Sequence, residues 1–248
     1  MIDTHAHLYG VEGGADEAVE RAAEAGVTRI VCIGALGLDD VREAVGLAER
    51  HEGIFATAGI HPHHALEWDE QVRAELDGLL QHPCVVAVGE CGLDYYRDRA
   101  PREAQRRAFE GQVELAERHE KPLVVHTRDA TEDTLAVLRG TSVPVVLHCF
   151  SLTDEVQECI ERGWYCSFAG NVTYPAADDL RAAAAAVPAE LLLLETDAPY
   201  LAPVPHRGKP NRPELVLDTL RAVAAARGDD VDELATTVQR NAERVFVL

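Results

Sequence analysis

Two histidines near the start of the chain, separated by one residue, have the spacing of a metal-binding pair. They occur in the segment MIDTHAHL. In an extended strand His5 and His7 project to one side, with Asp3 pointing the same way one repeat earlier, because side chains alternate between faces. Such a pair also occurs on half-buried strands that bind no metal. It therefore predicts a metal site only if further ligands converge on it.

Further residues of metal-ligating type follow later apolar runs of the sequence. Each occurs near the end of a short strand-like segment, and they are Glu90, His126, His148 and Asp197. If these segments are parallel strands of one barrel, their C-terminal ends form a common mouth. All six side chains would then face that mouth.

The alternation of strand-like and helical patterns predicts such a barrel. Strand-like runs are expected at 1–8, 28–35, 54–62, 84–94, 122–128, 143–150, 164–170 and 191–199. Helical patterns are expected at 16–25, 39–51, 70–80, 101–120, 130–138, 154–161 and 178–187, and after Pro213 and Val231. Eight such units predict an α/β fold, a (β/α)8 TIM barrel forming a single domain over residues 1–248. A doubly wound sheet is the competing architecture, but the loop GVEGGA after the first strand lacks its GxGxxG fingerprint.

Imidazole and carboxylate ligands predict a site for one or two divalent ions such as zinc or manganese. The predicted metal ligands are His5, His7, Glu90, His126, His148 and Asp197. We expect one ion on His5, His7 and Asp197, a second on His126 and His148, and Glu90 as the bridging carboxylate. Two such ions lower the pKa of a bound water and clamp both oxygens of an in-line displacement. Asp197, beside that water, is the expected general base, so Asp197 and Glu90 are the predicted catalytic residues.

Positive and aromatic residues surround this expected mouth. They predict a substrate-binding group made up of His61, His63, Tyr95, Arg128, His206 and Arg207. Such residues fit an anionic phosphodiester whose base stacks on an aromatic ring. The alternative is that Tyr95 only packs its loop and that Arg207 pairs with a surface acid.

The composition limits the other classes of function. The formal net charge is −20, and only Lys121 and Lys209 are lysines. A strongly acidic surface argues against general nucleic-acid binding, although it says little about one local cleft. We interpret the acidity as a halophile-like adaptation to a salt-rich cytosol. Because no signal peptide, membrane-length apolar stretch or CxxC pair occurs, we expect a cytoplasmic protein with no membrane partner.

Taken together, these segments resemble the TatD family of metal-dependent deoxyribonucleases, a branch of the amidohydrolase-like barrels. The matching segments, in family order, are IDTHAHL, AGVTRIVCIG, AGIHPH, VGECGLDYYRD, QRRAFEGQVELA, KPLVVHTRDA, VVLHCFS, LLLETDAPYLAP, HRGKPNRP and QRNAERVF. The resemblance implies a (β/α)8 barrel with one or two divalent ions, whether zinc, manganese or magnesium, held by the same six residues. It also implies hydrolysis of DNA phosphodiesters, often from single-stranded or 3′ ends, with His63, Arg128 and His206 on the substrate side.

Three hypotheses for function stay open from the sequence. The first is a DNA-cleaving, 3′–5′ exonuclease-like hydrolase. The second, which the resemblance also allows, is a D-aminoacyl-tRNA deacylase or another ester or amide hydrolase that uses the same metals, so that tRNA is a second possible partner. The third is a metal-dependent binding module without catalysis, for which a complete ligand set would be surplus. Assays on labelled single-stranded DNA and on D-aminoacyl-tRNA separate the first two.

Overall fold

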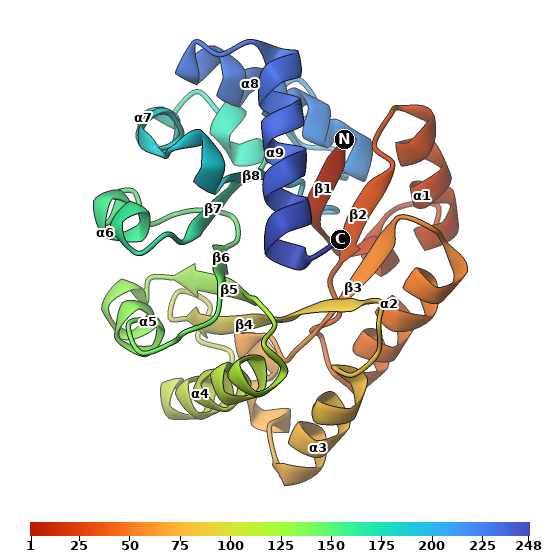
Figure 1. Ribbon diagram of the computed structural model, residues 1–248, viewed down its shortest axis with the longest axis vertical. Helices are drawn as coiled ribbons and strands as arrows, with labels where there is room; N and C mark the ends of the chain where they lie inside the picture. Colours follow the sequence, from red (N-terminus) through yellow and green to blue (C-terminus); the bar gives the residue numbers. More distant parts are fainter. The chain divides into compact units, whose positions relative to one another are not determined.

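Eight parallel strands in chain order form one sheet of the protein, which a computed structural model describes over residues 1–248 (Figure 1). The strands are β1 (Ile2–Ala6), β2 (Arg29–Cys32), β3 (Ile54–Ala58), β4 (Val85–Asp94), β5 (Leu123–Arg128), β6 (Val145–Leu147), β7 (Tyr165–Phe168) and β8 (Leu192–Leu194). A parallel bridge between Ala6 and Ala198 joins the end of β1 to the segment that follows β8. The first and last strands therefore meet, and the predicted (β/α)8 barrel is confirmed.

The first seven helices begin and end within two residues of the ranges expected from the sequence, and two further helices follow Pro213 and begin at Val231, as expected. The helices are α1 (Ala15–Glu24), α2 (Leu38–Arg50), α3 (Glu70–Leu79), α4 (Arg102–His119), α5 (Thr131–Leu138), α6 (Val156–Glu161), α7 (Asp178–Ala186), α8 (Val216–Arg227) and α9 (Val231–Phe246). Asp69 and Asp230 cap α3 and α9 by accepting hydrogen bonds from backbone N–H groups of the first turn. Short 3-10 turns at Leu8–Gly10, Pro62–Glu67, Gly170–Thr173, Ala189–Leu191 and Pro213–Leu215 complete the chain. None of the helices combines the length and apolar composition that a membrane span requires.

Several strands end earlier than the sequence pattern predicts. β3 ends at Ala58 and β8 at Leu194, although apolar residues continue beyond both. Asp197, expected at the end of β8, and His148, expected on β6, therefore lie in the loops that follow these strands. The physical reason is that the residues after each strand leave the sheet ladder; for example, Asp197 has a left-handed backbone with a φ of 56°. Glu90, by contrast, lies inside the ten-residue strand β4, which continues to Asp94.

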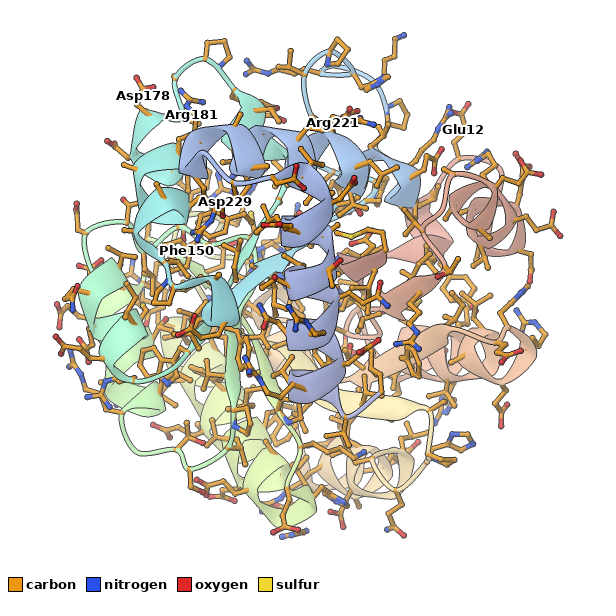
Figure 2. All side chains as sticks on the ribbon, turned by 45° about the horizontal axis from the view of Figure 1, so that its top comes forward. Glu12, Phe150, Asp178, Arg181, Arg221 and Asp229 are labelled. Carbon is orange, nitrogen blue, oxygen red and sulfur yellow. The ribbon has the colours of Figure 1, made fainter.

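Contacts divide the chain into two compact units, Met1–Cys32 with His148–Leu248 and Ile33–Leu147. In the first unit α9 packs against β1 and β8, and Ile2 and Phe246 are fully or almost fully buried. Its surface carries short-range ion pairs, such as Arg181 with Asp178 on α7 at 2.5 Å (Figure 2). In the second unit α4 packs along β4 (Figure 1).

Candidate metal centre

The histidine pair at the end of β1 faces a carboxylate. His5 lies on β1 and is fully buried, and His7 follows the strand directly. Their Nε2 atoms are 3.4 Å apart, and both lie near Oδ1 of Asp197, at 3.8 Å for His5 and 3.6 Å for His7. Two imidazole nitrogens and one carboxylate oxygen that converge in this way form a donor set suited to a divalent metal.

The backbone around this set is held by a buried carboxylate, Asp3. Its Oδ1 accepts hydrogen bonds from the N–H groups of His5 and Thr196, at 3.2 and 2.9 Å. Its Oδ2 accepts a 2.5 Å hydrogen bond from the hydroxyl of Thr196. Burial raises the pKa of Asp3 to about 8, against the effect of these hydrogen bonds. Asp3 thus fixes the segment before Asp197 relative to β1 rather than contributing a ligand.

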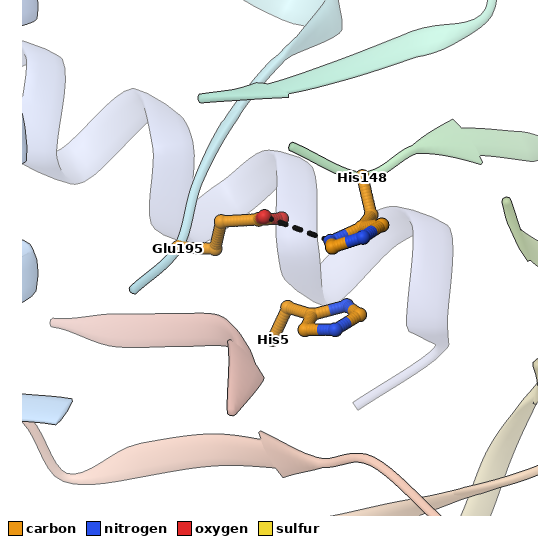
Figure 3. A group of neighbouring side chains, drawn as sticks. All are labelled: His5, His148 and Glu195. Carbon is orange, nitrogen blue, oxygen red and sulfur yellow. Dashed lines mark hydrogen bonds and ion pairs between the residues drawn. The ribbon is translucent and has the colours of Figure 1, made fainter. Parts of the chain in front are cut away.

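A second carboxylate of this unit, Glu195, orients His148. Nδ1 of His148 donates to Oε1 of Glu195 at 3.0 Å, because an ionised carboxylate can only accept (Figure 3). The ring of His148 also stacks on His5, with centroids 3.8 Å apart and planes inclined by 14°. In this tautomer Nε2 of His148 is the nitrogen with a lone pair, which is the arrangement found in carboxylate–histidine–metal sites.

Glu195 also bears on whether a cation fits here. Burial acts to raise its pKa, but the opposing effect of His148, with His5 adding to it, leaves that pKa below its usual value. Its Oε2 is buried and accepts no hydrogen bond. A buried carboxylate oxygen without a partner is costly, and a cation is one way of satisfying it. Because His5, His148 and Glu195 offer ligand atoms that all lie within 4.8 Å of one another, these residues fit a divalent ion.

In the second unit Glu90 is the centre of another histidine cluster. Its Oε1 accepts a hydrogen bond from Nδ1 of His126 at 2.9 Å, and Nε2 of His61 lies 3.4 Å away. Nδ1 of His61 accepts a hydrogen bond from the N–H of His63, so in the neutral ring Nε2 carries the proton. Burial lowers the pKa of His61 to about 4, which keeps that ring neutral. His61 thus faces Glu90 with a neutral ring, and His61, Glu90 and His126 offer ligand atoms that all lie within 4.8 Å of one another.

Asp94, at the end of β4, joins two further histidines. Its Oδ2 lies 2.7 Å from Nε2 of His63 and 3.4 Å from Nε2 of His126. Burial acts to raise the pKa of Asp94, but hydrogen bonds from His126, from the N–H of Arg97 and from His63 bring it well below its usual range. Both ring nitrogens of His126 therefore face carboxylate oxygens, Nδ1 that of Glu90 and Nε2 that of Asp94.

The residues predicted to bind substrate lie at several places around these clusters. His61 and His63 belong to the second cluster, and the exposed guanidinium of Arg128 lies 3.9 Å over the ring of Tyr96. The hydroxyl of Tyr95 donates to Asp133 at 2.7 Å, and burial raises the pKa of Tyr95 to about 12.

In the first unit, two residues of the predicted substrate group follow β8. His206 lies 3.5 Å from Asp218, and Arg207 lies over the ring of Tyr174 at 4.3 Å. Tyr95 thus has its partner on α5 and Arg207 lies over an aromatic ring, so neither contact is the one that the alternative supposed, which was packing within the loop for Tyr95 and a surface acid for Arg207.

The predicted ligands divide between the two units. Those of the first are His5, His7, His148 and Asp197, and those of the second are Glu90 and His126. The predicted bridging role of Glu90, and the grouping of His148 with His126 on one ion, stay predictions.

Glu195 was not predicted as a member of the site, and Asp94 was expected only in the layer of residues around the metals. Glu195 lies two residues before Asp197, so alternation along an extended segment could have indicated it. Asp94 was visible in the motif LDYYR, but its contact with His63 depends on a turn that no local pattern specifies.

Comparison with known proteins shows the family of the chain. A family profile described as TatD related DNase matches residues 2–247. A Mycobacterium tuberculosis protein named as an uncharacterized metal-dependent hydrolase TatD is 41% identical over 262 residues and covers 100% of this chain and 98% of its own length. A protein of Erwinia amylovora named as a 3'-5' ssDNA/RNA exonuclease TatD is 38% identical over 243 residues, covering 94% of this chain and 93% of its own.

The solved structures agree with the sequence relatives. The crystal structure of YJJV, a TatD homologue of Escherichia coli K12, superposes with a TM-score of 0.92 at 29% identity and covers 100% of this chain and 98% of its own. A barrel matched over almost its whole length, with histidine–carboxylate clusters on its strands and in the loops that follow them, places this chain in the TatD-related family of metal-dependent hydrolases.

Proposed function

We propose that this TatD-family hydrolase removes nucleotides from the 3′ ends of single-stranded nucleic acid, with DNA as its principal substrate. The observation that carries the proposal is the pair of histidine–carboxylate clusters, centred on Asp197 and on Glu90, in a chain 38% identical to a relative named as a 3'-5' ssDNA/RNA exonuclease. Nitrogen and carboxylate donors of this kind suit zinc, manganese and similar ions.

We further propose that one or two divalent ions are held by the six predicted ligands, His5, His7, Glu90, His126, His148 and Asp197. When bound, such ions supply an activated water and stabilise the charge that develops on the phosphate. The hydrogen bond between His148 and Glu195 keeps that imidazole in the tautomer able to ligate. Asp3 keeps Asp197 beside the histidine pair through its hydrogen bonds to Thr196.

The remaining chemistry falls to residues that handle the substrate and its protons. Asp197 accepts the proton of the attacking water, because its carboxylate faces the two histidines and its backbone is hydrogen-bonded to His5 and Tyr200. Arg128 is exposed and has no carboxylate partner, so its guanidinium can bind a phosphate oxygen. His63, whose ring is oriented by Asp94, supports the same phosphate or the leaving oxygen.

The test uses single-stranded 20-mers labelled at the 5′ or the 3′ end, incubated with protein and added Mn²⁺, Mg²⁺ or Zn²⁺. We expect the 5′-labelled strand to shorten stepwise and the 3′-labelled strand to release labelled mononucleotide at once, which marks removal from the 3′ end. Glu90→Ala should lower the rate by at least about 100-fold, as the loss of a ligand or its orienting partner does. Glu114→Ala, a change at an exposed carboxylate of α4, is the matched control and should leave the rate unaltered.

Three results would contradict the proposal. Cleavage by Glu90→Ala at the wild-type rate would refute the assigned centre. Metal-dependent hydrolysis of D-aminoacyl-tRNA, with labelled DNA left intact, would establish the deacylase alternative. Binding of metal without hydrolysis of either substrate would indicate a binding module.

A further inference from the structure

The segment from Arg97 to Arg107 has a charge opposite to that of the protein as a whole. It contains five arginines and only two carboxylates, Asp98 and Glu103, in a chain whose net charge is −20. We refer to the five as the arginine strip: Arg97, Arg99, Arg102, Arg106 and Arg107. In an acidic protein such a local excess of positive charge indicates a binding surface for an anionic partner.

The side chains of the strip are available to a partner. All five are exposed, and no carboxylate lies within ion-pair distance of Arg97, Arg99 or Arg107. Arg102 and Arg106 have pairs at 3.7 Å with Asp98 and 2.9 Å with Glu110, and pairs between exposed groups are weak enough to be exchanged for a phosphate.

Aromatic rings lie beside the strip. Tyr96 is 58% exposed. The guanidinium groups of Arg128 and Arg97 lie 3.9 and 5.8 Å from the centroid of its ring. Arg102 lies 4.2 Å over the ring of Tyr95. Exposed aromatic rings interleaved with arginines are the combination that binds single-stranded nucleic acid, through base stacking and phosphate contacts.

The strip is fixed to the second histidine cluster rather than carried on a loose loop. The fully buried side chain of Gln105 on α4 accepts from the N–H of Asp94 at 2.8 Å and donates to the carbonyls of Asp94 and Ala100 at 3.2 and 2.8 Å. Oδ1 of Asp94 accepts from the N–H groups of Tyr96 and Arg97, at 3.0 and 2.8 Å. The same carboxylate contacts His63 and His126. A nucleic-acid strand bound to the strip would therefore have a fixed position relative to the second histidine cluster.

We infer that the arginine strip binds the body of a single-stranded substrate, that is, the nucleotides on the 5′ side of the one being removed. This inference rests on the proposed exonuclease function and adds to it a length requirement. A substrate that reaches Arg107 makes phosphate contacts that a dinucleotide cannot make. Affinity should therefore rise with strand length and should depend strongly on salt concentration.

The test compares two charge-matched double variants, R99Q/R107Q on the strip and R221Q/R240Q on exposed arginines of α8 and α9. Binding is measured by fluorescence anisotropy with a labelled dT20 whose 3′ linkages are phosphorothioates that resist cleavage. We expect the strip variant to bind about tenfold more weakly, with a log–log salt slope reduced by roughly 0.7 per lost phosphate contact. The control should bind as the wild type does.

Turnover gives a second readout. For the wild type kcat/KM should be larger for dT20 than for a thymidine dinucleotide, and R99Q/R107Q should reduce that ratio about tenfold. A wild-type ratio near one, or equal losses of affinity in the two double variants, would overturn the inference while the exonuclease proposal stood. A third outcome is that the protein does not cleave DNA but R99Q/R107Q still binds dT20 more weakly than the wild type. That outcome would reject the exonuclease function and keep the strip as a surface that binds single-stranded DNA.

Discussion

At the scale of single residues, three carboxylates of the first unit have different roles in the candidate metal site. Asp197 faces the histidine pair, Glu195 orients His148, and Asp3 fixes the backbone between them. Their surroundings separate these roles, since Asp3 is surrounded by hydrogen-bond donors while one oxygen of Glu195 is buried without one. The consequence is that Glu195 should affect metal binding and Asp3 should affect mainly the geometry.

Glu195→Gln tests this assignment. The amide keeps the size of the side chain but can present its NH₂ group to His148, which removes the fixed tautomer. We expect the affinity for Mn²⁺ or Zn²⁺, measured by titration calorimetry, to fall about 10- to 100-fold, as substitutions of orienting partners do. Glu190→Gln, at an exposed carboxylate five residues earlier, should not change it. Equal metal affinity in all three proteins would remove Glu195 from the site.

At the scale of elements, the sequence predicted the order of the strands and helices and the approximate extent of the helices, because their hydrophobic periodicity is local information. It placed His5, Glu90 and His126 on strands correctly. The positions of His148 and Asp197 in loops could not be predicted, because an apolar run does not show where the sheet ladder ends. Local pattern also gives no reason for the buried glutamines of α4.

Gln105 and Gln112 are these buried glutamines, seven residues apart on the same face of α4. Gln105 holds the loop after β4, and Gln112 holds the loop after β3 by bonding to the N–H and carbonyl of Ile60. A helix that would conventionally bury leucines here instead buries amides, which pair with the loops that carry the site. The placement of the second histidine cluster thus depends on α4 as much as on β4.

Gln105→Met should show this dependence. It keeps the length of the side chain but leaves the N–H and carbonyl of Asp94 and the carbonyl of Ala100 without their partner. We expect the free energy of unfolding, measured by urea titration, to fall by about 2–4 kcal/mol, since each unpaired buried group costs roughly 1–3 kcal/mol and the loop can relax. Gln157→Met on the exposed face of α6 should change it by less than about 0.5 kcal/mol. A small effect at Gln105 would show that the loop is held by other contacts.

At the scale of the whole molecule, the charge is the dominant property. The chain has 43 acidic residues against 23 lysines and arginines, so the positive side chains can neutralise only about half of the carboxylates. Mutual repulsion of this kind destabilises the compact state unless salt screens it. The arginine strip stands out against this background, because a chain with a net charge of −20 repels an anionic nucleic-acid strand as a whole.

The stability of the protein should therefore increase with salt concentration. We expect a higher midpoint of thermal unfolding at about 2 M KCl than at about 0.1 M, since the Debye length shrinks from about 10 Å to a few Å. Scanning calorimetry over that range measures it, with sucrose at matched osmolality as the control for general solvent exclusion. Equal midpoints at both salt concentrations would reject the proposed adaptation to a salt-rich cytosol.

The bond between Asp3 and Thr196 closes a loop of 193 residues. During translation the strand bearing His5 and His7 is made first, yet its carboxylate partner Asp197 emerges only after almost two hundred further residues. A nascent chain therefore carries the histidine pair without the groups that complete it, and long-range closure of this kind is also slow. Activity that depends on this half of the site should therefore arise only when synthesis is nearly complete.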